Sequence, residues 1–196
     1  LCLVLVTALL AACTAVPISS YYSLSKIDPM KIDPAQIRVA IRVDESVNVT
    51  RGSAQITLSY QAESAGIDEE HQFDVQLTGS QALTPTLTKA MLPGERITVM
   101  SLSPGDAGAM RSFQRRLYQY KAAGIEGEGS LNLRVKDLCL DKTLPDRDIP
   151  LTLFFKTESD QDYIVFVRYE LHDLFSDISS DIEALAFCED SYVTDV

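Results

Sequence analysis

The chain has 196 residues, of which 46% are hydrophobic, with eight Tyr, seven Phe and no Trp. This length and composition fit one globular domain with a well-buried core, and they exclude a wholly disordered chain. The formal net charge of −11 argues against nucleic acid as a partner, because contacts with phosphate need clustered cations.

The first thirteen residues form an uncharged apolar run that ends in Leu10, Ala11, Ala12 and Cys13. The run is too short for a membrane-spanning helix, which needs about 20 apolar residues, but it suits the apolar region of a signal peptide. Its last four residues resemble the lipobox of bacterial lipoprotein signal peptides. The resemblance implies that residues 1–12 are removed and that Cys13 carries lipid, which anchors the chain to a bilayer without spanning it. A buried strand or helix of the mature fold is the alternative interpretation.

Residues 13–35 are expected to form a lipidated tether and an extended docking segment. Two Asp-Pro pairs support this, because a residue before proline is held out of helical geometry. In Gram-negative lipoproteins, Asp after the lipid cysteine favours the inner membrane, so Thr14 implies the outer membrane, facing the periplasm. The stretch Tyr21-Tyr22-Ser23-Leu24 also resembles the opening of ABC-transport auxiliary lipoproteins, which implies a transport accessory as an alternative role.

Alternating apolar and polar residues predict a series of half-buried strands after this segment. Short connections that contain Gly52 and Gly66 favour antiparallel neighbours, and a Pro93-Gly94 turn precedes a further strand at residues 96–102. The near-continuous apolar stretch at residues 163–171 predicts a strand buried on both faces. The alternating strands are centred on Ile37, Val39, Ile41 and Val43; on Ile56, Leu58 and Tyr60; and on Phe73, Val75 and Leu77. Further strand-like segments are expected at Leu131, Leu133 and Val135 and at residues 151–155.

One segment breaks this rhythm and predicts an amphipathic helix near residues 107–123. Met110, Phe113, Leu117 and Tyr120 recur at helical spacing, with Asp106 as the expected N-cap and Gly124 as the expected stop. A second, short helix is expected between Ser176 and Cys188. We therefore expect residues 36–196 to form a single globular domain that is mainly β, an antiparallel sandwich-like fold of seven or eight strands with one inserted amphipathic helix and a short C-terminal helix. A mixed α+β sheet is the alternative.

The cysteines predict one disulfide. Cys2 leaves with the signal peptide and Cys13 is used by the lipid, so Cys139 and Cys188 remain as a pair in an oxidising compartment. The bridge would enclose about 50 residues and stabilise the fold by roughly 4 kcal/mol on the chain-entropy estimate.

The sequence contains no strong signature of catalysis, metal binding or nucleotide binding, and we expect neither enzymatic activity nor a cofactor. The two histidines, His71 and His172, lack the spacing of a metal site, and His71 is expected in a solvated acidic turn at residues 68–71. The glycine-rich stretch at residues 124–129 follows a helix, whereas phosphate-binding loops precede one, so it predicts a helix stop and a flexible strand entry. Tyrosines are numerous enough to line a ligand groove, although packing against the core is the simpler interpretation.

A basic patch is the strongest candidate for binding. Arg111, Arg115, Arg116 and Lys121 share the predicted helix in an otherwise acidic protein. Exposed together, they would meet an anionic lipid or an acidic envelope protein; the alternative is a polar helix face paired with the acidic C-terminal part. The chain as a whole resembles uncharacterised proteobacterial lipoproteins. We thus expect a periplasmic, membrane-anchored, non-enzymatic binding or scaffold module; the alternatives are the transport accessory and an envelope hydrolase.

Overall fold

The computed structural model describes residues 27–78, 83–158, 161–171 and 187–188. Within these ranges the chain is mainly β, as the alternating pattern predicts. The elements are η1 (Pro34–Gln36), β1 (Arg38–Asp44), β2 (Val47–Asn48), β3 (Ala54–Ala62), η2 (Glu63–Ala65), β4 (Ile67–Leu77), α2 (Pro85–Thr88), β5 (Glu95–Leu102), α3 (Pro104–Ala122), β6 (Glu128–Val135), β7 (Cys139–Leu140), β8 (Pro150–Lys156) and β9 (Ile164–Glu170).

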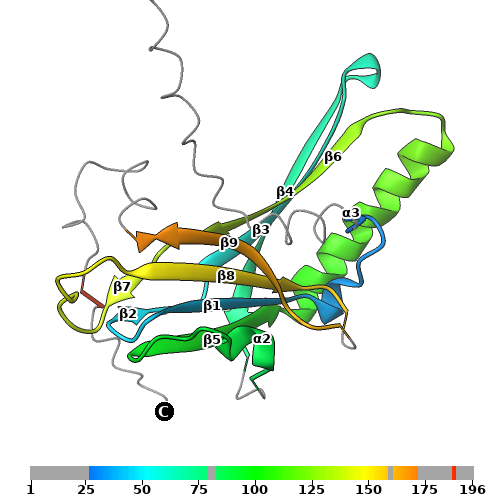
Figure 1. Cartoon of the computed structure of the whole chain (residues 1–196). Coiled ribbons are helices and arrows are strands. Elements are labelled where there is room, and N and C mark those ends of the chain that lie inside the picture. The colour runs from blue at the N-terminus through cyan, green and yellow to red at the C-terminus, as the bar shows by residue number, and fades with distance from the viewer. Residues whose placement is uncertain (1–26, 79–82, 159–160, 172–186, 189–196) are drawn as a thin grey trace, which may run out of the picture.

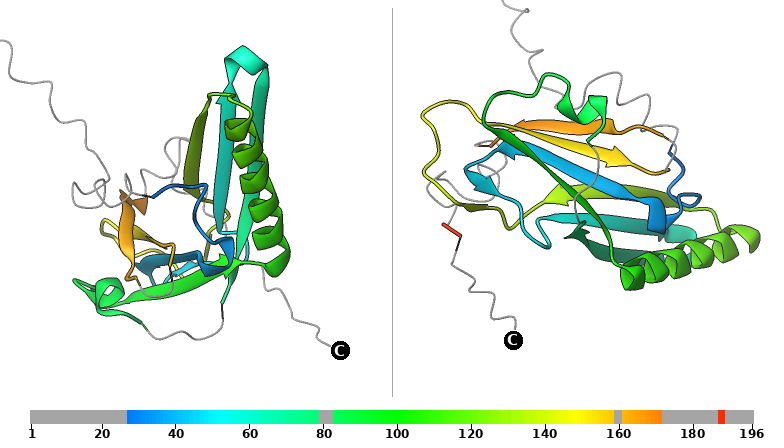
Figure 2. Two further views of the ribbon diagram at one scale, coloured as in Figure 1. Left: turned by 90° about the vertical axis from the view of Figure 1, so that its right-hand side faces the viewer. Right: turned by 90° about the horizontal axis from the view of Figure 1, so that it is seen from below.

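Seven strands form one antiparallel sheet in the order β6-β3-β4-β5-β1-β8-β9. The sheet curls strongly, and α3 lies along the β3, β4 and β6 part (Figures 1 and 2). The two parts of the sheet meet at β4 and β5, which pair through only three residues each, Val75–Leu77 with Met100–Leu102. This narrow junction lets the two parts turn their apolar faces toward one another, which gives the sandwich-like character of the fold.

The long helix confirms the predicted inserted helix and corrects its start. Ser103 is the N-cap: its hydroxyl accepts a hydrogen bond from the Asp106 backbone N–H, and Pro104 occupies the first helical position. Asp106 instead holds the third position, where its carboxylate accepts from the Ser103 hydroxyl. Gly124 ends the helix as predicted, with φ of 74° and the paired backbone hydrogen bonds of a Schellman motif.

The main core lies between α3 and the inner face of the sheet. Met110, Phe113 and Leu117 are almost completely buried on the helix, and they pack in one cluster with Ile41, Ile56 and further residues of the strands. The predicted stripe of α3 is therefore the face that contacts the sheet. Because this face supplies most of the apolar contact, the helix is held by tertiary packing more than by its intrinsic propensity.

The outer face of β1 is also buried, where the sequence predicts a half-buried strand. Ala40 packs there with Leu87 of α2 and with Phe154 of β8. Arg42 shares this face and is only 6% exposed: its Nη1 donates to the carbonyl oxygens of Leu87 and Lys89 at 3.0 and 2.8 Å. The guanidinium thus holds the α2 segment over the sheet, and it also forms a buried ion pair with Glu95, with 3.5 Å between Nε and Oε2.

Two further predictions about strands are corrected. The acidic stretch at residues 68–71 belongs to β4 and is not a turn, and Leu77 at the end of that strand is 51% exposed. In the described structure β9 pairs with β8 alone and most of its residues are partly exposed, so it is an edge strand and not one buried on both faces. Gly66 does connect the antiparallel neighbours β3 and β4. Gly52 instead connects β2 to β3, which do not pair with each other: β2 pairs with β7, and β3 pairs with β4 and β6.

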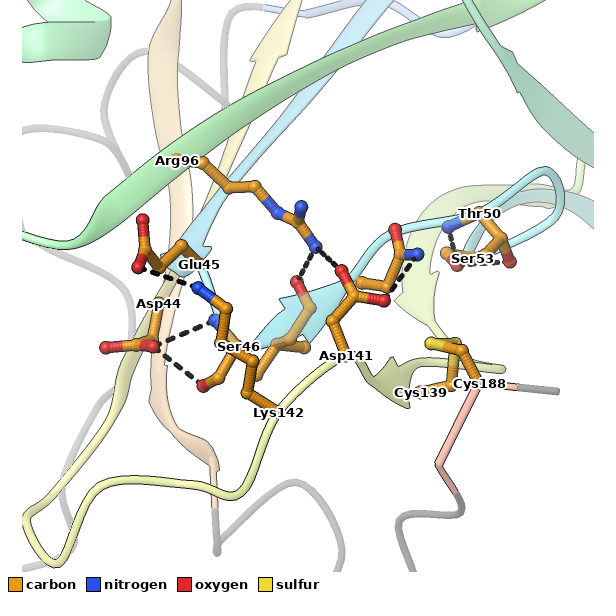
Figure 3. Close-up of polar contacts among 12 residues, drawn as sticks. Asp44, Glu45, Ser46, Thr50, Ser53, Arg96, Cys139, Asp141, Lys142 and Cys188 are labelled. Carbon is orange, nitrogen blue, oxygen red and sulfur yellow. Dashed lines mark hydrogen bonds and ion pairs between the residues drawn. A yellow bond between two sulfur atoms is a disulfide. The ribbon is translucent and has the colours of Figure 1, made fainter. Parts of the chain in front are cut away.

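A disulfide joins Cys139 to Cys188, as predicted, with 4.9 Å between the two Cα atoms. It lies beside β2 and β7, at the end of the domain farthest from α3 (Figure 1). Asp141 joins the same region: its carboxylate accepts hydrogen bonds from Asn48 at 3.0 Å and from Arg96 at 3.1 Å (Figure 3). The predicted C-terminal helix falls on residues that lie almost wholly outside the described ranges.

Candidate functional site

The four predicted basic residues do not form one free patch. Arg111 makes an ion pair with Asp33, and Arg116 donates to Glu69 through Nε and Nη2 at 3.2 and 3.0 Å. Arg115 donates to the Ser112 hydroxyl on its own helix. Two of the three arginines thus attach α3 to neighbouring elements. Their partners, Asp33 and Glu69, come from the segment before β1 and from β4.

Glu69 lies at the centre of a polar cluster between β4 and α3. The Tyr120 hydroxyl donates to its carboxylate, and this bond, followed by those from Arg116, holds the pKa of Glu69 below its ordinary value. The same hydrogen bond to Glu69 raises the pKa of Tyr120. The His71 ring packs at a tilt against Phe113 with 4.4 Å between ring centroids, and its Nε2 lies 3.0 Å from Arg116 Nη2. These contacts hold α3 on the sheet, and they engage the polar groups of Glu69, Arg116 and Tyr120 with one another.

A groove of about 670 Å³ opens next to this cluster. Its walls come from β3, from β6, from the C-terminal end of α3 and from the segment before η1. The volume lies within the range of small-molecule sites, roughly 300–1,000 Å³. The apolar part of the lining consists of Pro29, Met30, Leu58, Tyr60, Leu117 and Ile125.

Two glycines shape the groove, Gly127 just before β6 and Gly129 within it. Gly129 is opposite Tyr60 in the β3–β6 ladder, so a side chain there would point to the same face, toward α3. Its absence leaves space beside the Tyr60 ring. Gly127 is required for a different reason: a Cβ at this position would lie 2.5 Å from the Gln61 carbonyl oxygen and 2.6 Å from the Tyr60 ring. The Tyr60 ring is fixed by its hydroxyl, which donates to the Ile125 carbonyl oxygen at 3.2 Å.

Charged side chains complete the lining. Lys121 and Glu126 contribute one charge of each sign. Neither makes a direct ion pair in the described ranges, although Lys121 interacts electrostatically with the Asp28 carboxylate. Asp28 also lines the groove, but its carboxylate is engaged by Lys31 Nζ at 3.1 Å and by the Met30 backbone N–H at 3.0 Å. The groove therefore combines an apolar interior with one available cation and one available anion.

The sequence points to this site only in part. It singles out Lys121, and it marks residues 124–129 as a helix stop and strand entry, but it does not show that Gly127 and Gly129 face Tyr60. That relationship depends on the register between β3 and β6, which are separated by more than 65 residues along the chain. The sequence does contain one signal, a pair of glycines two residues apart where the strand begins, which indicates a close approach or a missing side chain.

Within the described ranges, no group of three or more His, Cys, Asp or Glu side chains could hold a metal ion, and no helix is long and apolar enough to cross a membrane. Of the two histidines, His71 belongs to the polar cluster on α3, while His172 lies outside the described residues. No protein-family model, no curated protein and no solved structure matches this chain.

Proposed function

We propose that the chain is a non-enzymatic binding module of the bacterial cell envelope that holds the apolar part of a ligand in the groove between β3, β6 and α3. The groove itself is the observation that carries this proposal. It is a concave site of about 670 Å³ with a mainly apolar lining and few charged groups, which is the usual composition of a ligand site.

The position of the groove supports binding over catalysis. In the adjacent cluster Glu69 binds Tyr120 and Arg116, and of the charged lining residues Asp28 binds Lys31, which leaves Lys121 and Glu126 without a direct ion pair in the described ranges. Acid–base or nucleophilic chemistry needs a nucleophile or base together with a group that orients it. The groove lining offers apolar contact and two isolated charges instead.

We further propose that lipid on Cys13 anchors this module to the outer membrane, facing the periplasm. The lipobox resemblance supports the lipid, and the disulfide supports an oxidising compartment outside the cytoplasm. Asp28 at the groove follows Cys13 by fifteen positions, and such a length of chain spans at most roughly 50 Å when fully extended. The groove would therefore work within reach of the bilayer surface.

Filling the groove tests the proposed function. Gly129→Leu places a side chain in the groove at a position where the added Cβ makes only ordinary contacts, 3.6 Å from the Ser59 carbonyl oxygen. Asn132→Leu on the exposed face of the same strand is the matched control. We expect the mature chain to enhance the fluorescence of the uncharged apolar dye N-phenyl-1-naphthylamine. Gly129→Leu should remove this enhancement and Asn132→Leu should keep it. Equal binding by both variants, or no binding by the unsubstituted chain, would overturn the proposal.

The anchor has a separate test. Cys13→Ser removes the sulfur that would carry the lipid, so we expect the variant to leave the membrane fraction of cells and to keep the apolar signal segment on intact-mass measurement. A chain that stays in the membrane fraction after this substitution would contradict lipid attachment at Cys13. The dye experiment on the purified domain does not depend on this result.

A further inference from the structure

Two opposite charges face the same apolar groove, and together they specify a class of ligand. Lys121 lies at an exposed position in the last turn of α3. Glu126 follows five residues later, after the turn at Gly124. Both line the groove, and neither makes a direct ion pair within the described part of the chain, although Lys121 also attracts the Asp28 carboxylate electrostatically. We propose that the groove binds an amphiphile with one apolar chain and a zwitterionic head group, whose anion contacts Lys121 and whose cation contacts Glu126. This inference rests on the proposed function and deepens it.

The apolar interior accounts for the chain of such a ligand. Met30, Leu58 and Ile125 offer aliphatic contact. The Tyr60 ring forms a fixed wall because its hydroxyl donates a hydrogen bond to the Ile125 carbonyl oxygen. Burial of the ligand's apolar surface away from water is the favourable contribution here. The volume of about 670 Å³ is that of a site for one small molecule, so it suits one chain and not the whole of a two-chain lipid.

The charges account for the head group. A purely anionic head would pair with Lys121 but would stand close to Glu126, and a purely cationic head would meet the reverse conflict at Lys121. The charge of Asp28 is already offset by its direct ion pair with Lys31 at 3.1 Å and by its electrostatic interaction with Lys121. A head group that carries a phosphate and an ammonium satisfies both available charges at once. Charge complementarity thus selects a zwitterion over either simple ion.

Three amphiphiles with the same dodecyl chain separate these cases: dodecylphosphocholine, dodecyl phosphate and dodecyltrimethylammonium, each below its micelle concentration. Their ability to displace N-phenyl-1-naphthylamine from the mature chain gives their relative affinities. We expect the zwitterion to bind more tightly than either ion by roughly two- to fivefold, which is the effect of one additional exposed ion pair. This comparison uses the unsubstituted chain, so it does not depend on how any variant folds.

Charge reversal then assigns each charge to its residue. Lys121→Glu should shift the preference to the cationic amphiphile, and Glu126→Lys should shift it to the anionic one. Arg115→Glu is the matched control, because it reverses a charge on the same helix at an exposed position that does not line the groove, and it should leave the order unchanged.

The outcomes separate this inference from the proposed function. If the dye binds but the three amphiphiles displace it equally, or if both reversals leave the order unchanged, the zwitterionic head group is overturned and the apolar site stands. If the unsubstituted chain does not bind the dye, the proposed function fails and the inference fails with it.

Discussion

Tyr120 of α3 stacks on Tyr60 of β3, with 5.8 Å between their ring centroids. The two rings join regions with different roles. The Tyr120 hydroxyl donates to Glu69 in the cluster that attaches α3 to β4, whereas Tyr60 forms a wall of the groove. The position of the groove wall therefore depends on the contact between helix and sheet. Substitution of Tyr120 tests this contact between helix and sheet.

Removing one hydroxyl tests the connection between the cluster and the helix. Tyr120→Phe keeps the stacked ring but takes away the donor to Glu69, so we expect a lower urea midpoint and a pKa of Glu69 that rises toward its ordinary value of 4.5. Tyr118→Phe is the control on the same helix, because Tyr118 is 44% exposed and should change neither quantity. Carbon-detected NMR titration of the carboxyl groups measures the pKa. An unchanged pKa of Glu69 in Tyr120→Phe would show that this hydrogen bond does not form in solution.

The lowered pKa of Glu69 also predicts how stability depends on pH. The hydrogen bond from Tyr120 and those from Arg116 favour the carboxylate in the folded state, so the folded pKa lies below the unfolded one. The resulting stabilisation is present above the unfolded pKa, near pH 4.5, and is lost as the pH falls through the lowered folded pKa. We expect Glu69→Gln to weaken this acid dependence.

Urea unfolding at a series of pH values between neutral and acidic checks this expectation. Asp68→Asn is the matched control, since Asp68 is an exposed neighbour on the same strand that faces away from the cluster. The two variants should differ most at neutral pH and converge in acid. Parallel stability curves for Glu69→Gln and the unsubstituted chain would contradict a role for this carboxylate.

The sequence predicts the elements of this fold better than it predicts their surroundings. Apolar periodicity marks β1 and α3 correctly because it reflects the face that each element buries. It does not show that the other face of β1 is covered too. That cover comes from Leu87, 47 residues beyond Ala40, and the guanidinium of Arg42 is buried because distant backbone carbonyls accept its hydrogen bonds. A charged residue in an alternating strand otherwise indicates solvent.

The basic patch shows the same limit. Arg111 and Arg116 stand on one helix in the sequence, and composition alone suggests an exposed cationic surface. Their partners are Asp33 and Glu69, which precede them by 78 and 47 residues. The pairings follow from the way α3 crosses β4 and the segment at η1, and these crossings are set by tertiary packing. Lys121, at the end of the same helix, makes no direct ion pair within the described ranges and lines the groove.

Gly127, just before β6, and Gly129, within it, should respond differently to the same substitution. Gly127→Ala brings a Cβ to 2.5 Å from the Gln61 carbonyl oxygen, and a backbone atom cannot easily move, so we expect destabilisation of about 1–3 kcal/mol. Gly129→Ala meets only contacts of 3.6 Å or more and should stay within about 0.5 kcal/mol of the unsubstituted chain. Denaturant unfolding of the two variants measures the difference. Equal stability would mean that the backbone at Gly127 does not approach Gln61 and Tyr60 as closely as described.

The bridge between Cys139 and Cys188 closes a loop with a sequence separation of 49 residues, which includes β8 and β9. On the chain-entropy estimate, its removal costs about 4 kcal/mol, because the unfolded chain regains the freedom of that loop. We expect Cys188→Ser to lower the free energy of unfolding by this amount, and dithiothreitol to lower that of the unsubstituted chain equally. The variant itself should not respond to the reductant. If reduction lowers the free energy of unfolding of the unsubstituted chain while Cys188→Ser keeps its full value, the effect of the reductant does not come from this bridge. If neither reduction nor Cys188→Ser lowers the free energy of unfolding, the bridge does not stabilise the fold, and the sheet alone holds β8 and β9.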